Sequence, residues 1–179
     1  VNPSIDQHIL IDQLIKDDAI RAREIRRDPG GKGINVSRVV HELGGATVAF
    51  AISGGCAGYM LRSLVAERGI VLESLEVPEE TRINVILTDR FDRTQTRISA
   101  PGPRVSLAEL ERFVQQMASH QPLPEWWVLG GSSPPGVPGR RPAHSSEARK
   151  AAWRFRRAGS MPPRSAPCSA PPTGSGRSS

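Results

Sequence analysis

The residues best suited to chemistry lie in one glycine-rich segment, Asp28–Ser37, which reads Asp-Pro-Gly-Gly-Lys-Gly-Ile-Asn-Val-Ser. Three glycines bracket Lys32, and Asn35 follows where apolar residues begin to recur at helical spacing. Glycine lets a ligand approach the backbone closely, and the first N–H groups of a helix have no intrahelical partner. The segment is therefore predicted to be a loop-to-helix junction that accepts an anion or a ring of hydroxyls. The alternative is an ordinary glycine-rich turn, but a lysine and an asparagine inside the turn favour a ligand.

The spacing excludes two common nucleotide motifs. No Gly-Lys pair is followed by Ser or Thr, as a P-loop requires, and the third glycine of a dinucleotide fingerprint is missing. The segment instead resembles the first signature of the PfkB sugar kinases, the ribokinase-like family. Seven positions fit that signature: Gly30, Gly31, Gly33, Asn35, Ser37, Gly44 and Gly54.

Three more segments resemble this family, and one of them, Thr81–Asn84, resembles its hexose-phosphate members. The three segments are Asn2-Pro3-Ser4-Ile5-Asp6, Thr81-Arg82-Ile83-Asn84, and residues 130–138, which are similar to Ser-Gly-Ser-Leu-Pro-Pro-Gly-Val-Pro. As a whole, the chain is most similar to the 1-phosphofructokinase and tagatose-6-phosphate kinase branch. The resemblance implies that Asp6, Gly31, Lys32 and Asn35 hold the sugar, and that Arg82, Lys32 and Ser132 lie near its phosphate.

Residue chemistry suits these implied roles. A carboxylate such as Asp6 offers about four acceptor sites to sugar hydroxyls. A guanidinium such as Arg82 matches a phosphate in a bidentate fork. From the residues alone, Asp6 would be a turn residue and Arg82 a solvated arginine on an edge strand. A fourth family pattern, Thr-Lys-Ile-Asn-Glu, reads Thr-Arg-Ile-Ser-Ala in residues 96–100: the charge is kept at Arg97, and the asparagine and the glutamate are lost.

The elements that must position these residues follow from local patterns. Val1–Asp6 is predicted to be the end of a strand turning into a loop, and Ala46–Ile52 and Trp126–Leu129 to be buried strands. Residues 81–89 and 94–99 are predicted to form a hairpin. A helix is expected after Ser106, whose side chain and Glu109 form a capping box. Tryptophans 126 and 127 are interpreted as core rather than as a stacking platform.

Together with the resemblance, these elements predict an α/β fold: a ribokinase-like three-layer αβα domain over residues 1–138, truncated after roughly half the domain. A small β-lid is expected from strands in residues 7–28 and 81–99. In the family such a lid covers the sugar and often pairs two subunits, so a homodimer through the lid is a further expectation.

The positive charge of the chain is concentrated in its last segment. The whole chain has a net charge of +6, and residues 139–179 hold nine Lys and Arg but one acidic residue, Glu147, and no Leu, Ile or Val. Such a segment cannot bury enough apolar surface to offset its ordering entropy, and it is predicted to be disordered. The preferred hypothesis is a reading-frame shift near codon 139. The alternative is a genuine basic tail, with Trp153 and Phe155 among arginines, that binds nucleic acid.

The resemblance implies ATP-dependent phosphorylation of a hexose phosphate such as fructose 1-phosphate or tagatose 6-phosphate. The family positions ATP and Mg²⁺ with an Asn-x-x-Glu motif and a Gly-Ala-Gly-Asp motif whose aspartate is the base, and this sequence contains neither motif. This chain is therefore expected to be inactive alone. Two alternatives stay open: a catalytically dead sugar-phosphate-binding protein, and nucleic-acid binding through the tail.

Cysteine usage and hydropathy set the expected compartment. Cys56 and Cys168 are too few and too far apart for a disulfide framework or a metal cluster. No apolar run approaches the length needed to cross a bilayer, and no signal-peptide pattern is present. A cytoplasmic location is therefore expected, without a membrane partner.

Overall fold

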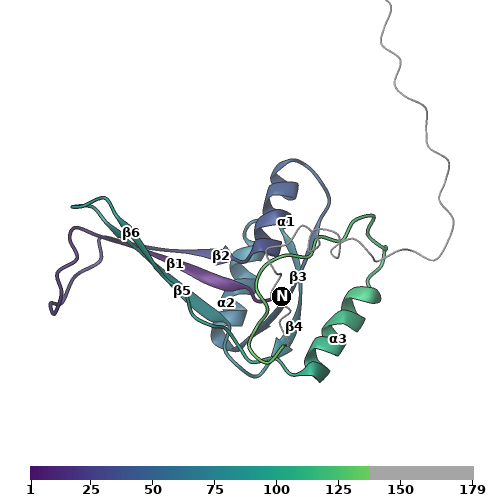
Figure 1. The fold of residues 1–179 in the computed structure, drawn as a ribbon. Helices are drawn as coiled ribbons and strands as arrows, with labels where there is room; N and C mark the ends of the chain where they lie inside the picture. The colour runs from purple at the N-terminus through teal and green to yellow at the C-terminus, as the bar shows by residue number, and fades with distance from the viewer. Residues whose placement is uncertain (138–179) are drawn as a thin grey trace, which may run out of the picture. The chain divides into compact units, whose positions relative to one another are not determined.

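The computed structural model describes residues 1–137, and the predictions made for residues 139–179 lie outside this part (Figure 1). The strands fall into two sheets, of four and of two strands. Within residues 1–137, no helix has both the length and the apolar character that a membrane span requires.

The four-stranded sheet, here named the lid sheet, extends away from the helices in Figure 1. Its strands, in spatial order, are β2 (Glu24–Gly30), β1 (Ser4–Ile11), β5 (Arg82–Asp89) and β6 (Gln95–Ile98). β1 and β5 are parallel, while the outer strands pair antiparallel with them. The predicted β-lid and its hairpin are confirmed. The predicted loop at Asp6 is wrong, because the strand that begins at Ser4 is paired on both sides and carries Asp6 within it.

The two faces of the lid sheet differ in polarity. Residues directly opposite each other in a ladder share a face, and successive residues alternate between faces. Asp6 of β1 lies opposite Asn84 of β5. Arg97 of β6 lies opposite Ile86 of β5, which is on the same face as Asn84. The other face carries an apolar set: Ile9, Ile25, Ile83, Val85, Leu87 and Ile98. The lid sheet therefore carries Asp6, Asn84 and Arg97 on one face, together with Ile86, and most of its aliphatic side chains on the other.

The second sheet is sandwiched between helices. It consists of the parallel strands β3 (Val48–Gly54) and β4 (Val71–Val77), with α1 (Lys32–Glu42), α2 (Gly55–Ala66) and α3 (Leu107–Ala118) around it. Ala49 packs with the fully buried Leu61 and Val65 of α2, whereas Ile52 packs with Phe113 of α3. Since Ala49 and Ile52 differ by an odd number of residues, they point to opposite faces of the strand. The predicted helix–sheet–helix layering is thus confirmed (Figure 1).

Hydrogen bonds join the two sheets where β3 ends. The Gly54 N–H donates to the Thr81 hydroxyl over 2.9 Å, and the Thr81 N–H donates back to the Gly54 carbonyl over 2.9 Å. A Cβ at Gly54 would collide with the Val77 carbonyl oxygen, so only glycine allows this close approach. The N-terminal end of β5, which begins at Arg82, is therefore fixed to the C-terminal end of β3.

The predicted strand at residues 126–129 is wrong. The structure has no strand there, and the side chains of Trp126, Val128 and Leu129 are 68%, 63% and 63% exposed. A strand requires a neighbour with free N–H and C=O groups, and the segment is separated from β3 by an apolar groove of about 600 Å³. The core assignment therefore fails for Trp126, while Trp127 packs against Phe50 with ring centroids 5.6 Å apart.

Candidate functional site

The glycine-rich junction connects β2 directly to α1. β2 ends at Gly30, Gly31 has φ 118°, and α1 begins at Lys32. This φ is in the region that favours glycine, and a Cβ at Gly31 would lie only 3.2 Å from the Pro3 Cα. No side chain caps the N-terminus of α1. The junction therefore presses against the segment Asn2–Ser4 and leaves the first helical N–H groups open to an acceptor.

Asp6 is the centre of a hydrogen-bond cluster on the polar face of the lid sheet. Its Oδ1 accepts from the Ser4 hydroxyl over 2.9 Å and from the Asn84 Nδ2 over 2.8 Å. Arg97 donates from Nη2 to Oδ2 over 3.1 Å and to Oδ1 over 3.3 Å. Gly30 lies against this cluster, because a Cβ there would come within 2.8 Å of the Asp6 carboxyl. The carboxylate is thus held in a fixed orientation.

Arg82 is bound mainly by backbone carbonyls. It donates to the carbonyl oxygens of Asn2, Pro3 and Ala100 over 3.0, 3.2 and 3.1 Å. A longer contact of 3.5 Å joins Nη2 to the Ser132 hydroxyl. Burial lowers the pKa of Arg82, an effect that neighbouring Asp6 opposes and neighbouring Arg97 reinforces. Arg82 therefore ties the N-terminal segment to residue 100 and brings Ser132 beside it.

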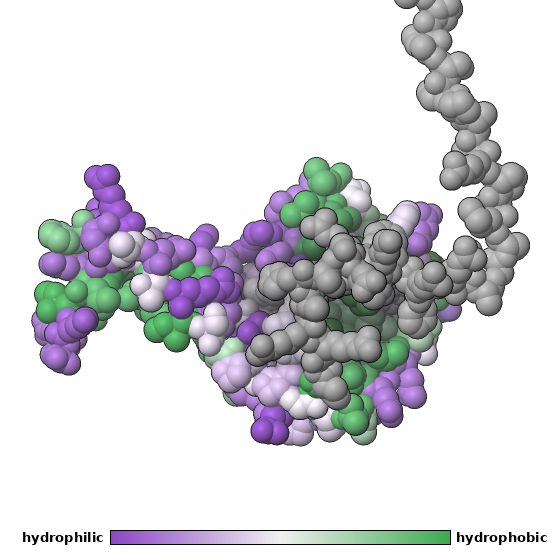
Figure 2. Space-filling model, in the orientation of Figure 1, coloured by the Kyte–Doolittle hydropathy of each residue, from purple (hydrophilic) through white to green (hydrophobic). Residues whose placement is uncertain are grey.

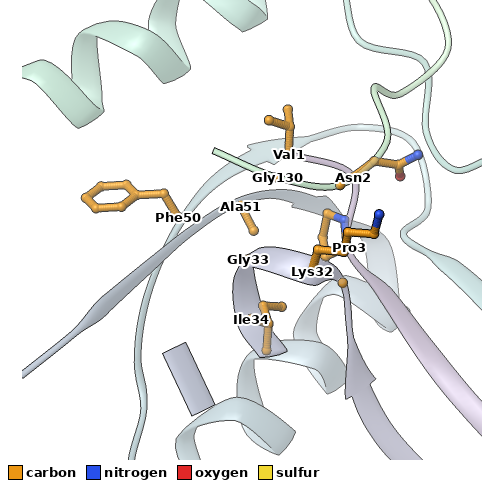
Figure 3. A pocket seen from close by; sticks show the side chains of 11 residues that line it. Val1, Asn2, Pro3, Lys32, Gly33, Ile34, Phe50, Ala51 and Gly130 are labelled. Carbon is orange, nitrogen blue, oxygen red and sulfur yellow. The ribbon is translucent and has the colours of Figure 1, made fainter. Parts of the chain in front are cut away.

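Lys32 borders a small cavity between the N-terminal segment and the loop at residues 130–131. The cavity has a volume of about 20 Å³, and its lining includes Asn2, Pro3, Lys32 and Gly131. Figure 3 shows the side chains of Asn2, Pro3 and Lys32 close together there. The buried Asn2 Oδ1 has no hydrogen-bond partner in the described chain. A volume of this size accommodates about one water molecule, so a hexose would have to lie outside the cavity.

Five of the six residues predicted from sequence meet around one segment. Gly31 lies against Pro3, and Lys32 lines the same small cavity as Asn2 and Pro3. Arg82 donates to the carbonyl oxygen of Asn2 and lies within 3.5 Å of the Ser132 hydroxyl. Asp6 accepts a hydrogen bond from Ser4. Asn35 is different. It is exposed on α1, and its side chain makes none of the hydrogen bonds found within residues 1–137.

Sequence reasoning missed two residues that hold Asp6, namely Asn84 and Arg97. In the sequence, Asn84 belongs to a segment that resembles the family and Arg97 keeps the charge of a family pattern, but neither is predicted to bind the ligand. Their period-2 positions on the two hairpin strands were the available signal, because that alternation puts both on one face. The missing information was the parallel pairing of β1 with β5, which no local pattern encodes.

Comparisons with known proteins show the family of the chain. Residues 2–121 match the model of the pfkB family carbohydrate kinases. A 1-phosphofructokinase of Xanthomonas campestris is 36% identical over 141 residues, which cover 77% of this chain and 43% of that protein. An ATP-dependent 6-phosphofructokinase isozyme 2 of Mycobacterium tuberculosis is 32% identical over 137 residues, which cover 76% of this chain and 40% of that protein.

A solved structure, of a possible 1-phosphofructokinase from Thermotoga maritima, superposes with a TM-score of 0.69 at 32% identity, covering 76% of this chain and 44% of that one. The chain thus spans less than half the length of these relatives. The family model covers well over half of the chain, over the same residues that build the lid sheet, the glycine-rich junction and α3. The chain belongs to the pfkB family of carbohydrate kinases.

Proposed function

We propose that this chain forms the sugar-phosphate-binding part of an ATP-dependent hexose-phosphate kinase of the 1-phosphofructokinase and tagatose-6-phosphate kinase type. The observation that carries the proposal is the convergence of Asp6, Gly31, Lys32, Arg82 and Ser132 on the segment Asn2–Ser4. The names of the relatives, a 1-phosphofructokinase and a 6-phosphofructokinase, support a phosphorylated hexose as the ligand.

Each converging group has a role that its chemistry supports. The Asp6 carboxylate accepts hydrogen bonds from sugar hydroxyls, and Gly31 leaves room for the ring beside the backbone. Lys32 and the uncapped N-terminus of α1 attract the phosphate, with Arg82 and Ser132 at its far side. Asn35, on the exposed side of the same helix, would contact the sugar only if the ligand extended over α1.

The residues present do not fit the second substrate. ATP and Mg²⁺ are expected for the family, but the sequence has neither the Gly-Ala-Gly-Asp motif nor the Asn-x-x-Glu motif. We therefore propose that this chain binds a hexose phosphate without transferring a phosphoryl group.

Calorimetric titration of the full 179-residue chain with fructose 6-phosphate, fructose 1-phosphate and tagatose 6-phosphate, without ATP, tests this function. Saturable binding of at least one of them is expected. A coupled ADP-release assay with the same sugars, ATP and Mg²⁺ should stay at the blank rate. Absence of binding to all three would refute the proposed ligand class, and turnover above the blank would refute the proposed inactivity.

We also propose that two copies associate through the apolar face of the lid sheet. Ile25, Ile83 and Ile98 on this face are 55%, 39% and 62% exposed. Figure 2 shows hydrophobic side chains among hydrophilic ones on the lid sheet, at the left of the view. Aliphatic side chains gathered on one sheet face favour burial against a second sheet. Sedimentation should show a dimer for the wild type and a monomer for Ile98→Lys; a monomeric wild type would refute the proposal.

A further inference from the structure

The two arginines near Asp6 differ in how many of their donors are available. Arg82 donates hydrogen bonds to three backbone carbonyl oxygens and to the Ser132 hydroxyl. The positions of those carbonyls are set by the backbone fold. Arg97 has the Asp6 carboxylate as its hydrogen-bond partner, and its side chain is 53% exposed. Of the two guanidiniums, Arg97 is therefore the one that can change partner without breaking the fold.

The acceptor sites of Asp6 are unevenly occupied. Oδ1 already accepts from Ser4 and Asn84 and takes the longer of the two Arg97 bonds. Oδ2 is bound by Arg97 at 3.1 Å and by no other side chain in the described chain. Oδ2 is therefore the oxygen with acceptor capacity left for the sugar hydroxyl that the proposed function assigns to Asp6, and the Arg97 guanidinium already binds it.

A phosphate offers Arg97 a better partner than Asp6 does. A phosphate dianion carries more charge than a carboxylate and accepts a guanidinium fork in the same bidentate way. Arg97 and Arg82 are close enough to repel each other, which contributes to the lowered pKa of Arg82, and an anion between them would relieve this repulsion. All four residues of β6 are exposed, so a movement of the Arg97 side chain would break few packing contacts.

From these contacts we infer that Arg97 is an exchange residue: it covers Asp6 when no ligand is bound and moves to the phosphate of an incoming sugar, which frees Asp6 for the sugar hydroxyls. This inference rests on the proposed function and deepens it. Its consequence is specificity. An unphosphorylated hexose does not draw Arg97 away and has to compete with it for Oδ2, whereas a hexose phosphate removes that competition.

The test compares two ligands, fructose 6-phosphate and unphosphorylated fructose, on the wild type and on Arg97→Gln. In the variant, the Kd for fructose 6-phosphate should rise about tenfold, as expected for loss of one charge-assisted contact. The Kd for fructose should fall several-fold, because Asp6 is no longer covered. The preference for the phosphorylated sugar should therefore fall by more than tenfold. Arg23→Gln, which removes another lid ion pair, with Asp12, is the matched control and should change neither affinity.

Three outcomes would overturn the inference: equal weakening of both ligands, weakening of fructose 6-phosphate with fructose unchanged, and no change at all. Inorganic phosphate gives an arm independent of the sugar. Inorganic phosphate should shift the guanidinium NMR signal of Arg97 in the wild type. In Asp6→Asn, where Arg97 has no ion pair with Asp6 to break, the same shift should occur at a lower phosphate concentration. An unmoved signal contradicts the exchange. If wild type binds no hexose phosphate, the proposed function fails; if it binds but keeps its preference in Arg97→Gln, only the exchange fails.

Discussion

Asn84 is the residue whose replacement most directly tests how the fold holds Asp6. Its side chain is 1% exposed and makes two hydrogen bonds: Nδ2 donates to Asp6 over 2.8 Å, and Oδ1 accepts from the Ala100 N–H over 3.2 Å. A hydrogen bond to a charged group contributes about 1.5–3 kcal/mol and a neutral one about 0.5–1.5 kcal/mol. Asn84→Ala should therefore lower the free energy of unfolding by about 2–4 kcal/mol.

Urea unfolding followed by tryptophan fluorescence measures this loss. Asn35→Ala deletes the same group at an exposed position and should change the unfolding free energy by less than about 0.5 kcal/mol. A loss below about 0.5 kcal/mol for Asn84→Ala would show that its two bonds do not contribute as argued.

Asn84→Asp adds a pH signature to the same test. It places a second carboxylate beside Asp6, and like charges at this distance raise the pKa of the introduced group. The resulting penalty grows as the pH rises from the ordinary aspartate pKa of about 4. Asn84→Asp should therefore be less stable than Asn84→Ala at pH 7, and the gap should shrink toward pH 4. A gap that does not vary with pH would refute the proposed contact between the two side chains.

Three further predictions concern the elements around the site. Ser106→Ala removes one side of the capping box of α3 and should cost about 1 kcal/mol in urea unfolding; no change would show that the box does not stabilise the helix. Hydrogen bonds from backbone N–H groups, the largest contribution coming from Leu14, lower the pKa of Asp89. Their stabilisation is present above the unfolded-state pKa of about 3.9 and is lost as the pH falls through the lowered folded-state pKa. Asp89→Asn should therefore speed amide exchange at Leu14 at pH 7. The difference from wild type should shrink below pH 4, as Asp89 of the wild type becomes protonated. Leu61→Ala, at a fully buried position, should lower the unfolding free energy by about 2–5 kcal/mol, and a smaller loss would contradict the packing of α2 on β3.

The elements that sequence predicted correctly are those with local signals. The glycine-rich junction and the capping box at Ser106 each depend on residues within a few positions of one another, and both are confirmed. Alternation and turn residues predicted the hairpin of β5 and β6, whereas lid strands in residues 7–28 were expected mainly from the family resemblance. Local signals failed where the structure depends on a partner far away in the sequence. Residues 126–129 have the composition of a strand, but within the described chain no neighbouring strand pairs with them.

The candidate site shows the same division. Residue types and spacing indicated the lysine, whereas the carboxylate and the arginine were indicated by the family resemblance. The structure brings all three around Asn2–Ser4. What spacing could not reveal is that the donors of Arg82 go to carbonyl oxygens, because every residue has a carbonyl and only the folded path places three of them together. The role given to Arg82 at the phosphate stays a prediction.

The three carbonyl bonds of Arg82 also bear on how the lid sheet could move. Asn2 and Pro3 precede β1, and Ala100 follows β6, so one guanidinium ties together both ends at which these strands leave the core. Sliding of one strand past another would break those bonds, whereas rotation of the whole sheet about this point would keep them. Because Arg82 itself begins β5, we expect any movement that keeps these bonds to carry β1, β5 and β6 together.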